Sequence, residues 1–425
     1  MMQILKESVK NMQEYKNPPC DVSRKNKIGG GGNGKVGFVL GQEDELAIKI
    51  FSVNENLDDE KRNRRYERFC REIVMQQQLS GEMDGILPVL DFSFPEKYSK
   101  NQCAWYTMPR AEKFLVRDGI SLIAKLQKMY ELAKILKELH RKDMAHRDLK
   151  PDNLLIYGGK IFLADYGLLW VAGENTITPP TELLGPIKIM PPELEERESL
   201  RKCDYTKSDV YLFAKVVWMY VNENDFGYRG EYSRKDPQRS LRVKINYGKT
   251  LEPLHLMMEK CSKHDWSERP SIEECMELIE HQIMILKGEF PQQKEREYAI
   301  KEQLSSYRMN VNPDVEVYEN EEKVLAFFRD MVKAADVKIV IDEMGRRRLI
   351  EPYSVRMLQD KLFVFSEEVT EGQIRKSAMQ IHRIEIDEEK IVALLGNISE
   401  EQKTNAESSG IEVISGNYEA EITLK

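Results

Sequence analysis

The stretch that decides the fold is His146-Arg147-Asp148-Leu149-Lys150-Pro151-Asp152-Asn153, followed by the apolar runs LLIY at 154–157 and KIFLADYG at 160–167. The two runs indicate a pair of short strands after a polar loop. Such a loop can place Asp148 as a base and Lys150 beside a transferring phosphate. Asn153 and Asp165 would then supply oxygen ligands for magnesium. Because phosphoryl transfer needs this positioning and charge neutralisation, the segment predicts a phosphoryl-transfer site.

Upstream, the glycine-rich stretch IGGGGNGKVGFVL at 28–40 lies between two predicted strands. Gly29, Gly31 and Gly34 form a GxGxxG match, which is a weak signal on its own. Because a strand rather than a helix follows, the match disfavours a dinucleotide-binding fold. It favours a flap over nucleotide phosphates, with Val36 covering the adenine. A tight hairpin without a ligand is the alternative interpretation.

The next predicted strand, ELAIKIF at 45–51, contains Ala47 and Lys49. A lysine that faces inward on this strand can pair with the α and β phosphates, and a buried lysine needs a counter-charge. Glu72 on the following helix is the favoured partner. Glu67, about a turn and a half away on the same helix, is the competitor. An ion pair between strand and helix is expected with either residue.

Hydrophobic periodicity separates a sheet-rich first part from a helical second part. Apolar residues at intervals of three and four predict helices at 64–81, ending on Gly81, and at 120–140, 209–221 and 271–286. The polar, charge-rich span at 288–312 reads as a linker. A chain of 425 residues exceeds the size at which one core keeps growing, so a separate C-terminal domain is expected at 313–425.

Composition argues against several functional classes. With 64 basic and 72 acidic residues, the net charge of −8 gives no electrostatic reason to expect nucleic acid or an anionic membrane as the main partner. No segment approaches the roughly 20 uninterrupted apolar residues of a membrane helix, and the N-terminus lacks the apolar core of a signal peptide. The six cysteines are scattered, without zinc or disulfide spacing. A cytoplasmic protein is expected.

From Arg24 to about Lys287 the sequence resembles the protein kinase superfamily, through the glycine loop, the AIK at 47–49, the HRDLKPDN at 146–153 and the DYG at 165–167. The resemblance implies an α+β bilobal fold with a β-rich N-lobe at 24–108, a larger helical C-lobe at 112–287 and an N-terminal extension at 1–23. It also implies ATP and Mg²⁺ as cofactors and proteins as substrates.

The same resemblance assigns roles to individual residues. The implied catalytic set is Asp148, Lys150, Asn153, Lys49 and Glu72. The implied ATP-binding set is Ile28, Gly29, Gly31, Gly34, Val36, Ala47, Lys49, Met108 as gatekeeper, Ala111 in the hinge and Leu155 as the pocket floor. Glu193 would end the activation segment and pair with Arg269, and Asp209 would brace the catalytic loop. WYTMP at 105–109 and SDVYLFAKVVWM at 208–219 look most like a bacterial serine/threonine branch.

Four departures from the family pattern bear on the active arrangement. Asn33 stands at the loop tip where an aromatic residue is common, and Tyr166 follows the metal-binding Asp in place of Phe. Gln76, four residues after Glu72, stands where an apolar packing residue is usual. Pro186 stands where serine/threonine kinases usually present a threonine hydroxyl. None of these removes a catalytic group, and Lys150 still favours serine/threonine acceptors over tyrosine.

Regulation by phosphorylation is a further expectation. Arg147 precedes the catalytic Asp, and in kinases with this arrangement the arginine can pair with a phosphate on the activation segment. The candidate acceptors are Thr176, Thr178 and Thr181, with the last two favoured. Solvated loop threonines are the alternative, because Arg147 could instead pair with the nearby acids at 174 or 182.

In the C-terminal domain, the pattern predicts helices at 321–335, around 371–382 and at 400–409, and strands at 337–341, 361–365, 390–395 and 411–415. This alternation indicates a small α/β domain. RRRLIEPYSVRMLQDKLFVF at 346–365 resembles WYL-type sensing domains, and the stretch 390–415 resembles the second half of a restriction-endonuclease-like fold. No ExK strand of an active nuclease is found. Sensing or interaction, with a small-molecule or protein ligand, is therefore expected.

Two functional hypotheses follow for the whole chain. The first is an active kinase that transfers the γ-phosphate of ATP to a protein hydroxyl, in bacterial signalling. The alternative is a pseudokinase or scaffold that binds nucleotide and partners without turnover. Because every catalytic side chain is present, the first hypothesis is favoured.

Overall fold

In this computed structural model, the structure describes two sets of residues. The first comprises 15–31, 34–53, 56–99, 101–173, 188–195, 203–234, 236–243, 249–292, 294–295, 298 and 302; the second comprises seven strands after residue 336. The chain divides into two compact units, Met1–Lys244 with Pro253–Leu286 and Ile245–Glu252 with Lys287–Lys425. No helix in the described ranges is long and apolar enough to cross a membrane.

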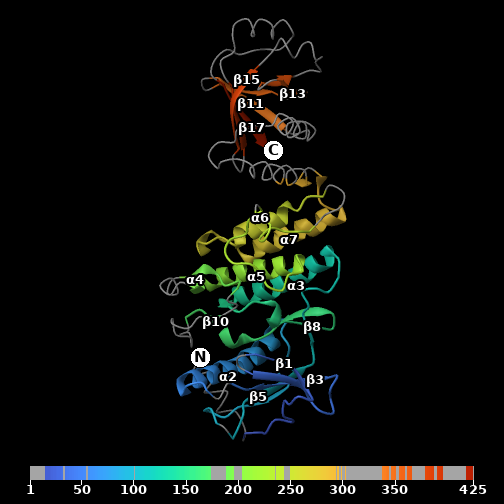
Figure 1. Ribbon diagram of the computed structural model, residues 1–425, viewed down its shortest axis with the longest axis vertical. Helices are drawn as coiled ribbons and strands as arrows, with labels where there is room; N and C mark the ends of the chain where they lie inside the picture. The colour runs from blue at the N-terminus through green and yellow to red at the C-terminus, as the bar shows by residue number, and fades with distance from the viewer. Residues whose placement is uncertain are drawn as a thin grey trace. The chain divides into compact units, whose positions relative to one another are not determined.

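The first unit begins with a five-stranded antiparallel sheet, drawn in blue in Figure 1. Its strands, in spatial order, are β1 (Lys27–Gly31), β2 (Gly34–Phe38), β3 (Leu46–Phe51), β5 (Trp105–Pro109) and β4 (Asp91–Ser93). The register places Lys49 opposite Val36 on one side and Tyr106 on the other. Because directly paired residues share a face of a sheet, these three side chains emerge on the same side.

That side is covered by helix α2 (Asp59–Glu82). Phe69 and Ile73 of α2, both fully buried, belong to one hydrophobic cluster with Ala47 and Tyr106 of the sheet. The predicted helix at 64–81 was too short at its start, because Asp58 caps the helix by accepting a hydrogen bond from the Lys61 amide. The predicted stop at Gly81 is wrong, since α2 continues through it to Glu82.

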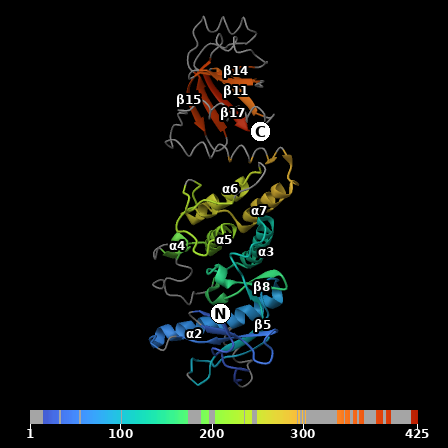
Figure 2. The same ribbon diagram turned by 45° about the vertical axis from the view of Figure 1, so that its right-hand side comes forward.

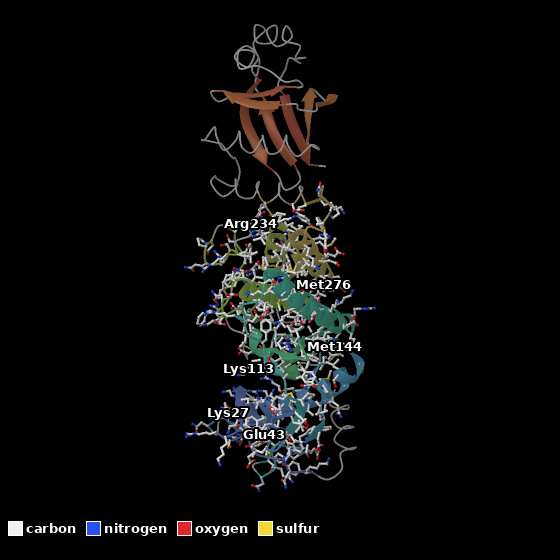
Figure 3. The ribbon with its side chains drawn as sticks, turned by 90° about the vertical axis from the view of Figure 1, so that its right-hand side faces the viewer. Lys27, Glu43, Lys113, Met144, Arg234 and Met276 are labelled. Atoms are coloured by element: carbon white, nitrogen blue, oxygen red, sulfur yellow. The ribbon has the colours of Figure 1, made fainter. Side chains whose placement is uncertain are left out.

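The second part of this unit is mainly helical. Its elements are β6 (Glu112–Lys113), α3 (Leu122–Arg141), β7 (Met144–Ala145), β8 (Leu154–Tyr157), β9 (Lys160–Leu163), β10 (Trp170–Val171), α4 (Pro192–Glu195), α5 (Tyr205–Val221), α6 (Glu252–Cys261) and α7 (Ile272–Lys287). Figures 1 and 2 show α3, α5, α6 and α7 gathered together at the far side of β8 from the sheet. In Figure 3, Lys113 and Met144 lie between the sheet-rich part, marked by Lys27 and Glu43, and the helical part, marked by Met276 and Arg234.

Helix α5 forms the centre of the helical part. From Ser208 to Val221 each of its residues is buried, including Asp209 and Lys215. The expected helices at 120–140, 209–221 and 271–286 correspond to α3, α5 and α7, and α6 is an addition. The observed architecture is thus the α+β bilobal fold that the sequence predicts, with a β-rich part and a larger helical part.

The second unit contains a seven-stranded antiparallel sheet. Its strands are β11 (Val337–Glu343), β12 (Arg346–Ile350), β13 (Ser354–Leu358), β14 (Lys361–Phe365), β15 (Met379–Ile386), β16 (Lys390–Leu395) and β17 (Tyr418–Leu424), in the spatial order β12-β11-β17-β16-β15-β14-β13. The edge strands β12 and β13 are consecutive in the chain. Since only residues 351–353 separate them, their facing ends lie within about 14 Å of each other, and the sheet must curl.

The predicted strands at 337–341, 361–365 and 390–395 are confirmed as β11, β14 and β16. The predicted helix around 371–382 is wrong at its end, because Met379 to His382 belong to β15, a strand that contains three β-branched isoleucines and pairs with β16. The other predicted helices, at 321–335 and 400–409, and the strand at 411–415 lie outside the described residues. Strands β12, β13 and β17 were not predicted.

Candidate active site

Between β7 and β8, the loop that carries Asp148 folds back on itself through side-chain hydrogen bonds. Lys150 Nζ donates to Asp148 Oδ2 at 2.7 Å. Asn153 Nδ2 donates to the Asp148 carbonyl at 2.7 Å and to Asp148 Oδ2 at 2.9 Å. Asp148 Oδ1 is buried and has no hydrogen-bond partner among the described residues. One carboxylate oxygen is thus fixed by the loop, and the other is left as an acceptor.

Asp209 of helix α5 holds this loop in place through two hydrogen bonds to its backbone. Asp209 Oδ2 accepts from the His146 amide at 2.7 Å, and Oδ1 accepts from the Arg147 amide at 2.8 Å. Arg147 has a φ of 68°, an uncommon left-handed conformation for a residue with a side chain. Because Asp209 is fully buried, its two charge-assisted bonds stabilise the strained loop. This contact corresponds to the bracing role that the family resemblance implied for Asp209.

Lys49 on β3 and Glu72 on α2 form a buried ion pair, with Lys49 Nζ 2.5 Å from Glu72 Oε1. Of the two partners that the sequence suggested, the structure therefore selects Glu72 over Glu67. Lys49 Nζ also lies 3.9 Å from Asp165 Oδ2. Burial favours the neutral amine, yet the carboxylates of Asp165 and Glu72 raise the pKa of Lys49 above its ordinary value. The lysine is therefore held as a cation.

Asp165 lies at the end of β9 with a φ of 66°, and this left-handed turn precedes a short 3-10 helix, Tyr166–Leu168. Tyr166 is fully buried, and its hydroxyl donates to the Leu163 carbonyl at 2.8 Å. Burial favours the neutral carboxyl, but the Lys49 charge, with His146 and Lys150, holds the pKa of Asp165 below its usual value. Asp165 is thus an ionised carboxylate close to Lys49.

The pKa values of two carboxyl groups in the site, Asp148 and Asp165, are shifted in opposite directions. Burial raises the pKa of Asp148, and the neighbouring Lys150 charge counteracts this only in part. In Asp165 the neighbouring cations outweigh burial. A carboxyl whose pKa is raised is a better proton acceptor at neutral pH, whereas one whose pKa is lowered stays charged. Asp148 is therefore suited to act as the base, and Asp165 is suited to bind a metal ion.

The apolar residues expected around an adenine come together on the sheet side of the site. Ala47 and Met108 are buried members of one hydrophobic cluster. The partly buried residues packed against it include Ile28, Val36, Ala111 and Leu155. Ala47 and Met108 face each other directly on β3 and β5. The structure thus brings all six of these residues into one apolar group.

The described part of the glycine-rich stretch forms β1 and β2, which pair with each other in antiparallel fashion. Gly29 pairs with Val36, and Gly31 pairs with Gly34. A Cβ at Gly34 would lie 2.8 Å from the Ile50 carbonyl oxygen and 3.3 Å from the Phe69 ring, so a side chain there would push β2 away from β3. A Cβ at Gly29 would meet nothing closer than 3.9 Å. Asn33, at the loop tip, lies outside the described residues.

Asn153 and Asp165 provide a donor set suited to Mg²⁺. Both Asn153 contacts to Asp148 use Nδ2, so its amide oxygen remains available as an acceptor, and Asp165 supplies an ionised carboxylate. Within the described ranges, no three His, Cys, Asp or Glu side chains gather into a complete metal site. Mg²⁺ commonly takes one or two protein oxygens and completes its shell with water and substrate phosphates, so the two residues fit this ion.

The end of the activation segment is fastened to the helical part by Glu193. Arg269 donates to both Glu193 oxygens, at 2.7 and 2.8 Å, and Ser208 Oγ donates to Glu193 Oε1 at 2.6 Å. Arg147 lies over the Tyr205 ring, with its guanidinium carbon 4.4 Å from the ring centroid. Thr176, Thr178, Thr181 and Pro186 lie outside the described residues, so their part in regulation and specificity stays a prediction.

Sequence reasoning missed two contributors to this site. Tyr106 donates its hydroxyl to Glu72 Oε1 at 2.7 Å. Ser208 joins the Glu193 pair described above. A tyrosine within a predicted strand and a serine near a helix start are both ordinary local choices, so neither position carries a functional signal in the sequence.

Comparisons with known proteins agree with this geometry. A model of the protein kinase domain matches residues 22–282. The chain is 25% identical over 280 residues to a mitogen-activated protein kinase kinase kinase 7-like protein of Drosophila melanogaster, covering 60% of this chain and 64% of that protein. It is 28% identical over 151 residues to an Aurora kinase of Schizosaccharomyces pombe, covering 35% and 40%. It is 25% identical over 202 residues to serine/threonine-protein kinase PrkC of Bacillus subtilis, covering 45% and 28%.

The chain thus spans between about a quarter and two-thirds of the length of these relatives. The domain match, in contrast, covers more than half of the chain and contains every catalytic residue named above. The fold, the paired Lys49 and Glu72, and the braced loop at Asp148 agree with it. This chain belongs to the protein kinase superfamily.

Proposed function

We propose that the chain is a serine/threonine protein kinase that transfers the γ-phosphate of ATP to hydroxyl groups of protein substrates. The observation that supports it most is the convergence on one site of Asp148, with an uncommitted buried oxygen, and the cations of Lys150 and Lys49. Two serine/threonine kinases among the relatives, PrkC of Bacillus subtilis and CTR1 of Arabidopsis thaliana, support the same acceptor class.

Each residue has a defined task in this reaction. Asp148 Oδ1 accepts the proton of the acceptor hydroxyl as the new oxygen–phosphorus bond forms and the bond to ADP breaks. Lys150, already 2.7 Å from Asp148, neutralises charge on the transferring group. Lys49, held by Glu72, does the same at the α and β phosphates. The apolar group around Ala47 and Met108 takes the adenine.

Asn153 and Asp165 would hold Mg²⁺, which supplies charge neutralisation at the phosphate oxygens when it is bound. The role of the protein is then to keep these two oxygen donors aligned. The Asn153 bonds to Asp148 tie the metal side of the site to the base. Loss of Asn153 would therefore disturb both functions at once.

The finer parts of the proposal concern biology and acceptor choice. We propose a role in bacterial cytoplasmic signalling, with residues 313–425 as a separate domain that senses a ligand or binds a partner. The acceptor class has a competitor, because a tyrosine-protein kinase of Spongilla lacustris is 29% identical over 154 residues, covering 35% of this chain and 45% of that protein. Phosphoamino-acid analysis of a labelled acceptor distinguishes the two classes.

The central test is phosphate incorporation by purified protein with labelled ATP, magnesium and generic acceptors. Asp148→Ala and Asp165→Ala should each lower incorporation by about 100-fold or more, while phosphoserine and phosphothreonine account for the wild-type product. If the wild type incorporates nothing with magnesium or manganese yet still binds ATP, the pseudokinase or scaffold alternative is correct.

Regulation by activation-segment phosphorylation is a second element of the proposal. Its motivation is that Arg147 directly precedes the catalytic Asp148, and that Thr176, Thr178 and Thr181 lie between Asp165 and Glu193 in the sequence. Mass spectrometry after incubation with ATP should find phosphate on Thr178 or Thr181, and the Asp148→Ala protein controls for modification by another kinase. Full activity of the triple alanine variant would refute the regulatory role alone.

A further inference from the structure

Tyr106 of β5 lies directly opposite Lys49 of β3, on the face of the sheet that α2 covers. The alternation of the strand therefore points its side chain toward the same helix that carries Glu72. Tyr106 is 2% exposed and Glu72 is 1% exposed, so the two polar groups meet away from water. Their contact is a hydrogen bond of 2.7 Å from the tyrosine hydroxyl to Glu72 Oε1.

Gln76, one helical turn after Glu72, extends this contact. Its Oε1 lies 3.5 Å from the Tyr106 hydroxyl, and its Nε2 donates to the Leu87 carbonyl at 3.0 Å. Gln76 is 2% exposed. The departure noted in the sequence, a polar residue at a packing position, thus belongs to a buried polar network. Four residues, Lys49, Glu72, Gln76 and Tyr106, are linked in it.

The network supplies the hydrogen bonds that stabilise the buried carboxylate of Glu72. Both of its described hydrogen bonds, from Lys49 and from Tyr106, fall on Oε1, and Oε2 has no hydrogen-bond partner in the described part of the chain. Burial raises the pKa of Glu72, and the bonds from Lys49 and Tyr106 oppose this. A buried carboxylate with so few donors depends strongly on each one.

We propose that Tyr106 is a positioning residue, which with Gln76 latches helix α2 to strand β5 and so keeps Glu72 on Lys49. The inference rests on the proposed function for its role in phosphate transfer. Its geometric basis is independent of that function. If α2 moves outward, Glu72 loses the hydroxyl together with the lysine, and Gln76 loses the Leu87 carbonyl. The latch therefore favours the arrangement in which Lys49 is aligned for the nucleotide phosphates.

The experiment compares the full-length wild type with Tyr106→Phe, which removes one hydroxyl and keeps the ring. Tyr211→Phe is the matched control, because Tyr211 is also a buried tyrosine and its hydroxyl donates to a backbone carbonyl, that of Gly230, at 3.0 Å. The measurements are KM for ATP, KM for an acceptor peptide, kcat, and the dissociation constant of ATP by calorimetry.

Tyr106→Phe should raise both KM and the dissociation constant for ATP, and lower kcat/KM for ATP by about 10-fold, which corresponds to about 1.4 kcal/mol. KM for the acceptor should stay unchanged. Tyr211→Phe should leave both KM values unchanged. A merely structural role would lower the amount of folded enzyme, which reduces kcat and moves neither KM.

Gln76→Met supplies a second variant, because it removes the amide and keeps a side chain of similar length. It should shift KM for ATP in the same direction by about threefold, since it loses the weaker contacts. Unchanged ATP affinity and KM in both Tyr106→Phe and Gln76→Met would overturn the latch. If the wild type binds ATP without transferring phosphate, the proposed function fails, and the calorimetric comparison still decides the latch.

Discussion

Lys215, in the middle of helix α5, is a buried lysine without a carboxylate partner among its described hydrogen bonds and ion pairs. It is 0% exposed, its Nζ donates to the Gly230 carbonyl, and it lies 3.3 Å from the centroid of the Tyr228 ring. Burial lowers the pKa of Lys215 to about 6, and the charges of Arg239 and Arg269 act in the same direction, while Glu231 opposes them. At neutral pH this amine is mostly uncharged.

The effect of Lys215 on the free energy of unfolding follows from the linkage between protonation and folding. The unfolded chain holds the Lys215 proton up to its ordinary pKa of 10.5, whereas the folded chain releases it near pH 6. Stability from this group is therefore fully present above pH 10.5 and is lost as the pH falls toward 6, at about 1.4 kcal/mol per pH unit. At pH 7 the accumulated cost is several kcal/mol. Lys215→Met removes this cost and one hydrogen bond, so it should stabilise the protein by about 3 kcal/mol at pH 7.

Thermal unfolding measured by calorimetry between pH 7 and 9 tests this reasoning. The wild type should gain stability relative to Lys215→Met by about 2.7 kcal/mol across this range, so the advantage of the variant should shrink toward zero. Lys125→Met is the control, because Lys125 is also buried but forms a 2.6 Å ion pair with Glu223. It should destabilise by about 1 kcal/mol. A destabilised Lys215→Met, or an advantage that is the same at pH 7 and pH 9, would refute the argument.

Two further predictions concern the helical part and the domain boundary. Glu193→Gln leaves the fully buried Arg269 charge without its carboxylate and should lower the free energy of unfolding, measured with denaturant, by about 3–5 kcal/mol. Glu195→Gln is the control, because its partner Arg229 is largely exposed, and it should lower this free energy by less than about 1 kcal/mol. Equal losses in the two variants would contradict this prediction. A chain ending at Lys287 should stay soluble and bind ATP if residues 313–425 fold separately. Because Lys249 bonds to Glu295 and the Leu251 amide to Glu302, a chain ending at 305 should be the more stable of the two, and aggregation of both would show that the boundary is wrong.

Much of the kinase part could be predicted because its chemistry is local in sequence. Asp148, Lys150 and Asn153 lie within six residues, so the loop that carries them needs no knowledge of distant contacts. Lys49 requires a partner wherever it is buried, which restricts the choice to acids on the following helix. The Glu193 and Arg269 pair, in contrast, was predicted only from the family resemblance, because the two residues are 76 positions apart in the sequence.

The errors arise where local patterns compete with tertiary structure. Gly81 is a plausible helix stop, yet its backbone is not in the left-handed region, and the helix passes through it. Residues 379–386 contain periodic apolar positions that fit either a helix or a strand, and pairing with β16 selects the strand. Tyr106 could not be assigned a role from sequence, because its importance depends on register with Lys49 and on the position of α2.

Helix α5 carries both buried polar residues that hold the site and buried apolar residues that stabilise the fold. Its first two turns carry Ser208 and Asp209, which hold the end of the activation segment and the catalytic loop through buried polar bonds. Such bonds fix orientation more than they add stability, because each polar group must first lose its water. Lys215, about two turns later, lowers stability further, because its buried amine must release its proton at neutral pH. The apolar side chains from Val216 to Val221, all buried, must offset both costs. A substitution that shortens this apolar face, such as Trp218→Ala, should therefore impair catalysis through loss of folded protein, whereas Asp209→Asn should impair it in protein that remains folded.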